Sequence, residues 1–320
     1  MIPVYNPNRE QLRAAIDSVL KERGTARPMQ VELVDDCSPN PVAADLMREL
    51  AGEPVSLHRN STNLGLAGTW NVCIDRARGD VVHILHQDDY VLPGFYASLE
   101  PAFTSPSVGA AFCRHAYVDA AGSRTGESEL ESDRPGILSD LKYRLASDSR
   151  VQCPAIVVRR SCYDAVGRFR TDLPYILDWE MWLRISVAWQ VYYEPRVLAC
   201  YRVHASNQTT NLQRTGEDVR DIGRFFQIAE AALPDRRGRD MVRRGRKTYA
   251  RRALQIASSF IGSDEAHAAW AQVRAAWRLQ PSVSLVPPTA KCGLKYFAGL
   301  LGRKPGGSIR SSATSAAIPQ

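Results

Sequence analysis

The sequence lacks the features that mark secreted and membrane-spanning proteins. No apolar run approaches the roughly 18 residues that a bilayer-spanning helix needs, and the N-terminus lacks the basic-then-apolar order of a signal peptide. The seven cysteines are odd in number and include no CxxC pair, so a disulfide framework is not indicated. Several of them lie inside apolar runs, which predicts reduced, buried thiols in a cytoplasmic protein.

Internal repeats are absent as well, and basic residues are concentrated in one segment. Between Arg236 and Arg252 the chain has nine Arg and Lys against one Asp, a local charge of +8 in a chain whose net charge is +7. The remainder is therefore close to neutral. Nucleic-acid-binding proteins more often interleave basic and aromatic residues, so we expect no nucleic-acid partner. The segment is either a solvated helix face or an interfacial helix that binds anionic headgroups.

What the chain does have is an alternation of short apolar runs and amphipathic stretches over its first 200 residues. Strands separated by helices favour an α/β fold with a mainly parallel sheet flanked by helices. The patterns predict strands at residues 31–36, 81–85, 109–115 and 155–160, and helices at residues 9–23, 43–51 and 69–77. The opening run "MIPV" is short for the first strand of such a sheet, which favours a start upstream or a trimmed chain.

The rest of the chain differs in pattern. Residues 119–150 are polar and predict either an insertion or mobile loop over a site, or a plain surface loop. A helical pattern extends from about residue 212 to 280, and "KCGLKYFAGLLGRK" (291–304) resembles an amphipathic membrane-surface helix that could equally pack on the main domain. We therefore expect a catalytic-type domain at 1–212, a helical and membrane-associating extension at 213–304, and a disordered tail at 305–320.

Two predicted strands end in adjacent carboxylates, Asp35-Asp36 in "VDDCSPN" and Asp88-Asp89 in "HQDDYVLPG". In parallel sheets, ligands gather at the carboxyl ends of the strands. Paired carboxylates supply the charged oxygen ligands that a hard divalent cation prefers, and a cation would also relieve their mutual repulsion. The alternatives are a solvated Asp pair at residues 88–89 and a helix cap, with Ser38 as N-cap, at the first pair.

The order of the motifs "IPVYN", "VDDCSPN", "NLGLAGTWN", "HQDDYVLPG", "LDWEMWLR" and "YRVH" resembles that of the family 2 glycosyltransferases, which have the GT-A fold. The resemblance covers roughly residues 1–210. It implies a donor pocket for a nucleoside-diphosphate sugar, most simply a UDP-sugar. Residues implied in this pocket are Pro3, Tyr5, Asp35, Asp36, Asn63 and Asp88, with Asp36 facing the base and Asp88 the ribose.

The resemblance also implies the reacting groups. Asp89 and His204 would hold Mn²⁺ or Mg²⁺ against the diphosphate, and Asp178 would be the general base, with Glu180 as the fallback. A cation stabilises the charge that grows on the leaving group, and a carboxylate activates the acceptor hydroxyl. An ordinary amphipathic helix capped by Asp178 is the alternative for "LDWEMWLR". The chain departs from the family pattern at His86, Trp70 and Leu177.

The sequence thus predicts a hexosyltransferase-type enzyme that works with inversion on a saccharide or lipid-linked acceptor. We expect it to act in cell-surface polysaccharide or glycolipid synthesis, in the cytoplasm or peripherally at the inner membrane face. A nucleotidyltransferase is the first alternative, although the Gly- and Lys/Arg-rich triphosphate loop of such enzymes is not visible near the N-terminus. A non-catalytic nucleotide-sugar-binding protein is the second.

Overall fold

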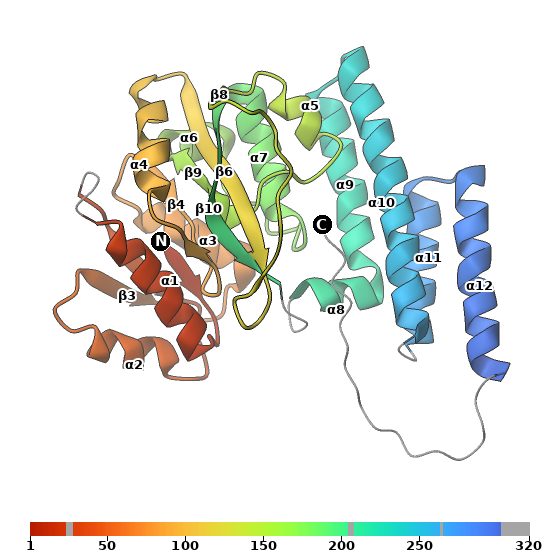
Figure 1. Ribbon diagram of the computed structural model, residues 1–320, viewed down its shortest axis with the longest axis horizontal. Helices are drawn as coiled ribbons and strands as arrows, with labels where there is room; N and C mark the ends of the chain where they lie inside the picture. Colours follow the sequence, from red (N-terminus) through yellow and green to blue (C-terminus); the bar gives the residue numbers. More distant parts are fainter. Residues whose placement is uncertain (24–27, 204–207, 263–264, 302–320) are drawn as a thin grey trace. The chain divides into compact units, whose positions relative to one another are not determined.

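The chain folds into two compact units. The computed structural model describes residues 1–23, 28–203, 208–262 and 265–301. Unit 1 comprises Met1–Leu145 and Ser149–Val203, and unit 2 comprises Ala146–Asp148 and His204–Gln320. Unit 1 contains a sheet covered by helices, whereas the described part of unit 2 is helical (Figure 1). The predicted metal ligand His204 and the predicted tail 305–320 lie outside the described residues.

The first part of unit 1 is a parallel sheet with the order β1–β2–β3. These strands are β1 (Ile2–Val4), β2 (Val31–Asp35) and β3 (Val55–Arg59). β1 is short, but backbone hydrogen bonds extend its free edge: Met1 N donates to His83 O at 2.9 Å, and Leu85 N donates to Met1 O at 3.0 Å. The segment that contains β4 (Val81–His83) therefore lies directly beside β1.

The second part of unit 1 is a mixed sheet with the order β4–β9–β6–β10–β5. Its further strands are β5 (Tyr90–Val91), β6 (Val108–Val118), β9 (Ile156–Arg159) and β10 (Gln190–Arg202). β6 and β10 are parallel, but β9 is antiparallel to both of its neighbours. A parallel neighbour would need a crossover helix, and the chain between β6 and β9 instead forms short strands and a single helical turn. The predicted α/β fold is confirmed, and β5, like β9, is antiparallel to its neighbour in this sheet.

Residues 119–150 are more regular than the polar composition predicts. They contain β7 (Arg124–Glu127), which pairs with β6, β8 (Gly136–Ile137), which pairs with β10, and α5 (Leu141–Leu145). Both strands are short and partly exposed, so their side chains carry no apolar alternation. Polar edge strands of this kind are invisible to a search for buried runs.

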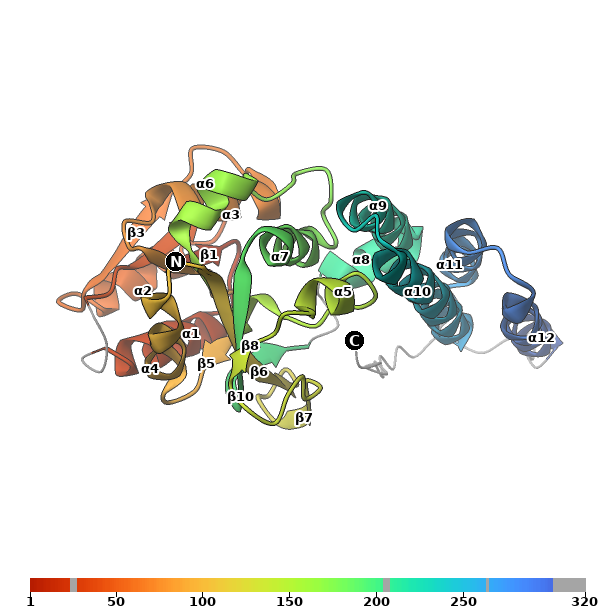
Figure 2. The ribbon, with the colours of Figure 1, turned by 90° about the horizontal axis from the view of Figure 1, so that it is seen from above.

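Helices cover both faces of the sheet (Figure 2). One face carries α1 (Arg9–Lys21), α2 (Val42–Glu49) and α4 (Phe95–Leu99), and the other carries α3 (Gly65–Arg76), α6 (Arg160–Val166) and α7 (Leu177–Ala188). The predicted helix 9–23 is confirmed as α1. Asn8 caps it by accepting hydrogen bonds from Glu10 N and Gln11 N, and Leu12 and Ile16 are buried on its inner face.

Unit 2 consists of helices that pack around α10. Its helices are α8 (Gln208–Thr215), α9 (Glu217–Ala232), α10 (Arg236–Gly262), α11 (Ala266–Leu279) and α12 (Val286–Leu301), and α10 contacts α9, α11 and α12. Short 3₁₀ helices cover Glu100–Thr104, Cys153–Ala155 and Val283–Leu285. Among the described residues, no helix combines the length and the apolarity needed to cross a bilayer. The seven cysteines are free thiols and six of them are buried, as predicted.

Candidate active site

The carboxylates at the end of β2 are held by the chain's own donors. Asp35 forms an ion pair with Arg59 and accepts a hydrogen bond from the Ser38 hydroxyl. Ser38 does not cap α2, whose N-cap residue is Pro41, so the helix-cap interpretation of this motif is wrong. Asp35 therefore fixes the turn after β2 from inside, with its side chain almost completely buried.

Asp36 organises the first turn of α3 from across the loop. Its carboxylate accepts hydrogen bonds from Asn60 Nδ2 at 2.9 Å, Leu64 N at 2.8 Å and Gly65 N at 2.9 Å. Gly65 has φ of +73°, a conformation that favours glycine. Asn63 bonds the Asp36 carbonyl through its amide at 3.2 Å. The predicted donor-pocket residues 36 and 63 thus lie together, at the helix N-terminus where anions are favoured.

The side-chain amide of Gln87 joins the segment that follows β1 to the segment that follows β4. Gln87 accepts a hydrogen bond from Tyr5 N at 2.8 Å and donates one to Tyr5 O at 3.1 Å. The Tyr5 side chain is 51% exposed, whereas Pro3 is buried in β1. Beside these tips, Asn6 and Cys37 have positive φ values of 45° and 60°, which non-glycine residues seldom adopt. The motifs "IPVYN" and "HQDD" therefore meet at one edge of the sheet.

Three side chains after β4 form a cluster that could hold a metal ion: one potential ligand atom each from His86, Asp88 and Asp89 lies within 4.8 Å of the others. Asp89 is 1% exposed, and its Oδ1 accepts a hydrogen bond from Arg202 N at 2.7 Å. Its Oδ2 lies 3.1 Å from His86 Nδ1. Two ligands at right angles around an octahedral ion with bonds of about 2.1 Å lie about 3 Å apart, so these atoms fit neighbouring coordination positions.

The electrostatics of the cluster favour a cation. Burial, and then the neighbouring charge of Asp88, raise the pKa of Asp89 to about 6, although His86 and Arg202 oppose the shift. A bound divalent cation would remove this penalty on the ionised carboxylate. The His86 ring lies 5.0 Å from the Trp70 ring, which in turn packs edge-on against Phe169. Trp70 therefore supports the imidazole by ring contact.

Arg202 is a site residue that the sequence analysis did not identify, although it lies in the quoted motif "YRVH". Besides its backbone bond to Asp89, its guanidinium donates to the Asp88 carbonyl at 2.9 Å and to the carbonyls of Asp119 and Ala120 at 2.9 and 3.1 Å. It thus holds the Asp88-Asp89 turn against the end of β6. Its partners lie 82 to 114 residues away in sequence, so no local pattern announces the contact.

Asp178 lies in the first turn of α7, where its Oδ1 accepts a hydrogen bond from Trp179 N at 2.7 Å. Burial raises its pKa, against the lowering effects of this bond and of the nearby His86. Glu180, the fallback base, is buried in a bidentate ion pair with Arg184, with N–O distances of 2.8 to 3.0 Å. The two acids of "LDWEMWLR" therefore have different environments, and Glu180 is committed to Arg184.

The pKa of the Tyr201 hydroxyl is affected by several of these acids. Burial raises the pKa of Tyr201 well above 10, and the charges of Asp89, Asp178 and Asp88 raise it further, in that order. The electrostatic effects of all three carboxylates therefore reach this one hydroxyl. These acids lie after β4 and in α7, whereas Tyr201 lies in β10, so the charges that act on Tyr201 come from distant parts of the sequence.

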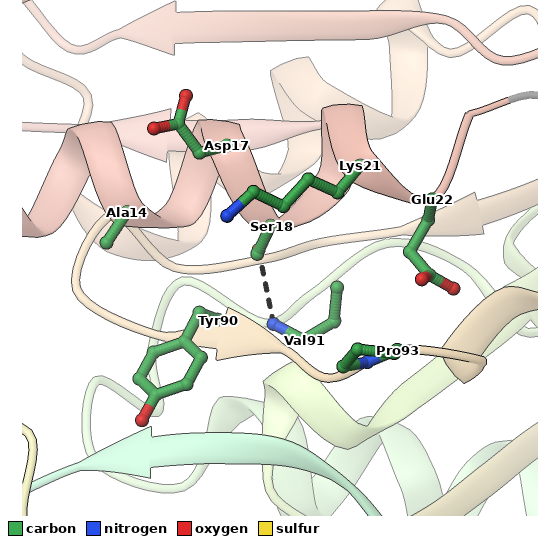
Figure 3. A pocket seen from close by; sticks show the side chains of 8 residues that line it. All are labelled: Ala14, Asp17, Ser18, Lys21, Glu22, Tyr90, Val91 and Pro93. Carbon is green, nitrogen blue, oxygen red and sulfur yellow. Dashed lines mark hydrogen bonds between the residues drawn. The ribbon is translucent and has the colours of Figure 1, made fainter.

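A separate pocket lies between α1 and β5 (Figure 3). Its lining residues are Ala14, Asp17, Ser18, Lys21, Glu22, Tyr90, Val91 and Pro93. Two of its polar side chains hold the β5 region against α1: Ser18 accepts a hydrogen bond from Val91 N at 3.2 Å, and Glu22 accepts one from Gly94 N at 2.9 Å. We assign it to the packing of the fold, because none of the carboxylates of the cluster lines it.

The comparison with known proteins identifies the family. The chain matches the sequence model of glycosyl transferase family 2 over residues 1–166, and it belongs to this family. A Mycobacterium tuberculosis protein without assigned function is 29% identical over 70% of this chain and 73% of its own length. An otherwise uncharacterized glycosyltransferase of Haemophilus influenzae is 24% identical over 69% of this chain and 75% of its own length. The resemblance predicted from the motifs is confirmed.

Solved structures show the same fold. The S. aureus TarS fragment 1–349 in complex with UDP-GlcNAc superposes with a TM-score of 0.55 at 11% identity, covering 87% of this chain and 90% of the fragment. A longer TarS structure gives a TM-score of 0.59 at 14% identity, covering 93% of this chain and 53% of TarS. The predicted GT-A fold with helices after the catalytic-type domain is therefore confirmed, and the chain is a glycosyltransferase by family.

Proposed function

We propose that this chain transfers a sugar from a nucleoside-diphosphate sugar to an acceptor hydroxyl by a single displacement that inverts the anomeric carbon. The observation that carries the proposal is the cluster of His86, Asp88 and Asp89, in which one potential ligand atom of each residue lies within 4.8 Å of the others. The charges of Asp89 and Asp178 both raise the pKa of Tyr201, which supports a place for Asp178 near this cluster. Such a displacement needs positive charge at the leaving diphosphate and a carboxylate at the attacking hydroxyl. The cluster around Asp89 and the nearby Asp178 provide groups suited to these two tasks.

His86, Asp88 and Asp89 would hold Mn²⁺ or Mg²⁺ in this reaction. Their mixed nitrogen and oxygen donors and the 3.1 Å spacing of His86 Nδ1 and Asp89 Oδ2 support this assignment. The cation supplies charge stabilisation to the leaving diphosphate. Arg202 would keep the two aspartates in place through its bonds to Asp89 Oδ1 and to the Asp88 carbonyl.

Asp178 would take the proton of the acceptor hydroxyl. Its burial raises its pKa and therefore its basicity, while the N–H of Trp179 orients the carboxylate. The ion pair of Glu180 with Arg184 supports Asp178 over Glu180 for this role. Tyr201, close to Asp178 and to the cluster, would line the space between donor and acceptor.

The donor pocket would lie at the tips of β1 and β2. The exposed ring of Tyr5 would stack on the base, Asp36 and Asn63 would shape the loop around it, and Asp88 would reach the ribose. Pro3 and Asp35, both buried, would support the pocket floor. The binding of UDP-GlcNAc and UDP by the TarS fragment supports a UDP-sugar as donor. A saccharide or lipid-linked acceptor in cell-surface polysaccharide or glycolipid synthesis fits this reaction class.

The test is a screen of activated sugars that measures nucleoside-diphosphate release, followed by Asp178→Asn. We expect transfer to fall by about 10²- to 10⁴-fold, because proton abstraction is lost. Calorimetric binding of UDP with Mn²⁺ should remain unchanged. The matched control is Asp172→Asn, an exposed acid six residues earlier that pairs with Arg170. Full transfer by Asp178→Asn rejects the base assignment, and UDP binding without transfer of any sugar favours a binding protein.

A further inference from the structure

Charge is divided unequally between the two units. Unit 2 contains 19 Lys and Arg against 9 Asp and Glu, a net charge of +10, and unit 1 carries the remaining −3. The excess is not needed for the chemistry proposed above, whose residues all belong to unit 1. A concentrated charge of one sign raises the local concentration of oppositely charged partners. Unit 2 therefore has an electrostatic property that the proposed function leaves unexplained.

The excess forms an ordered stripe on α10. Arg244, Lys247 and Arg251 are exposed and follow the spacing i, i+3, i+7, so they share one face of the helix. Arg237, also exposed, extends this face by two turns. We call these four residues the α10 stripe. From Arg237 to Arg251 the helix rises by about 21 Å at 1.5 Å per residue, so the stripe is long and straight.

Three members of the α10 stripe differ from their neighbours in having no counter-ion. Arg243 pairs with Asp240, and Arg252 binds Asp148 at 2.8 Å. Within the described parts of the chain, no carboxylate lies within ion-pair distance of Arg244, Lys247 or Arg251, and none of them has a hydrogen-bond partner. Unpaired like charges on one face repel each other, and an external anion would relieve that repulsion.

We propose that the α10 stripe docks the protein on an anionic lipid surface. A straight row of cations without interleaved aromatic side chains suits a flat layer of headgroups better than the stacked bases of a nucleic acid. Exposed Trp270 on α11, followed at i+4 by exposed Arg274, adds a side-chain type that favours the membrane–water interface.

The experiment uses the full chain and vesicles of phosphatidylcholine with or without phosphatidylglycerol. We expect sedimentation with the anionic vesicles only, and release at 0.5 M NaCl, because the Debye length then becomes short. In the triple variant Arg244→Gln, Lys247→Gln, Arg251→Gln, affinity for anionic vesicles should fall about 100-fold, since each cation near the surface contributes about fivefold. All three positions are exposed, so an unchanged thermal unfolding midpoint should accompany the loss.

The matched control removes three charges from unit 1 by Arg9→Gln, Arg48→Gln and Arg170→Gln, all of which are exposed and ion-paired. This variant should bind anionic vesicles as the unchanged chain does. Equal loss in both variants, or equal binding to neutral vesicles, overturns the proposal. So does displacement of the protein from vesicles by a 20-base-pair DNA duplex at equal phosphate concentration, or by 10 mM inorganic phosphate. Because binding is measured without substrates, the result is independent of the proposed transfer reaction.

Discussion

At the scale of single residues, one side chain of the site makes two different kinds of contact. His86 offers Nδ1 beside Asp89 Oδ2, and its ring packs against Trp70. Imidazole is a better ligand for Mn²⁺ and the later transition metals than for Mg²⁺, which prefers oxygen ligands. A histidine at this position should therefore shift metal preference toward Mn²⁺.

His86→Phe tests this shift, because it removes the nitrogen ligand and keeps a ring against Trp70. We expect Mn²⁺ affinity, measured by calorimetry, to fall at least about tenfold. The ¹⁴N modulation in the electron spin echo of bound Mn²⁺ should disappear in the variant. His267→Phe, which removes an exposed histidine of α11, is the control and should retain both affinity and modulation. A ¹⁴N signal that persists in His86→Phe would assign the nitrogen to another residue.

The residues that the sequence could not supply are those that act over long separations. Asp88, Asp89 and Asp178 can be recognised in the sequence, because two adjacent acids after an apolar run, or an acid at the beginning of an amphipathic stretch, form a local pattern. Gln87 and Arg202 carry no such pattern: Gln87 binds the backbone of Tyr5, 82 residues away, and Arg202 binds the Asp88 carbonyl, 114 residues away. Such contacts exist only after the strands have paired, so only the folded chain reveals them.

At the scale of elements, apolar runs identified the strands that are buried on both faces. β2 and β6 were predicted within a few residues because nearly every side chain in them is buried. β3 was not predicted, since its side chains are only partly buried and include His58 and Arg59. β10 is interrupted by the charged pair Glu194 and Arg196, at a register irregularity against β6. A search for hydrophobic periodicity therefore misses β3 because of its edge position and β10 because of its bulge, and not because their strand propensity is weak.

β6 also carries a buried histidine that should make stability depend on pH. His115 is 2% exposed, and neither ring nitrogen has a hydrogen-bond partner among the described residues. Burial, with a smaller effect of Arg114, lowers its pKa from 6.5 to about 4. The unfolded chain therefore binds a proton between pH 6.5 and 4 that the folded chain does not. The free energy of unfolding should fall as pH decreases through this window.

His115→Phe should flatten that dependence. The variant keeps a ring beside Tyr117, so the loss of stability between pH 7 and pH 4.5 should shrink by about 2–3 kcal/mol in urea unfolding. His83, whose pKa burial lowers to about 3, keeps its own contribution in both proteins. His267→Phe, at an exposed position of α11, is the control for loss of a histidine. An unchanged slope in His115→Phe would contradict the assignment.

At the scale of the whole molecule, the order of motifs predicted the family and the fold, because four of the six motifs lie at or near strand ends and two lie at the beginnings of helices. The helical segment after residue 212 was also predicted, from its amphipathic periodicity. Local patterns did not reveal that the short piece Ala146–Asp148 belongs to unit 2, since this depends on which helices it contacts. Asp148 accepts hydrogen bonds from Tyr249 and Arg252 of α10, both at 2.8 Å.

Asp148→Ala should therefore loosen α10 selectively. The Tyr249 hydroxyl and the Arg252 guanidinium lose a partly buried partner, which should cost about 1–3 kcal/mol. Hydrogen exchange of α10 amides should become faster, while that of α1 amides stays unchanged. Asp140→Ala, whose partner Arg144 lies in the same chain segment but in unit 1, is the control and should leave α10 exchange unaltered. Uniform acceleration over both units would contradict the selective effect.

The bonds of Asp36 to Asn60, Leu64 N and Gly65 N have a consequence for how specificity can change during evolution. Under the proposed role of Asp36 in the donor pocket, a substitution that suits a different base would also remove the bonds that hold the beginning of α3. A change of donor preference at this position would therefore come with a loss of rigidity. Tyr5, whose side chain is half exposed, is under no such constraint. We expect lineages that switch donors to vary first at Tyr5 and to keep the aspartate.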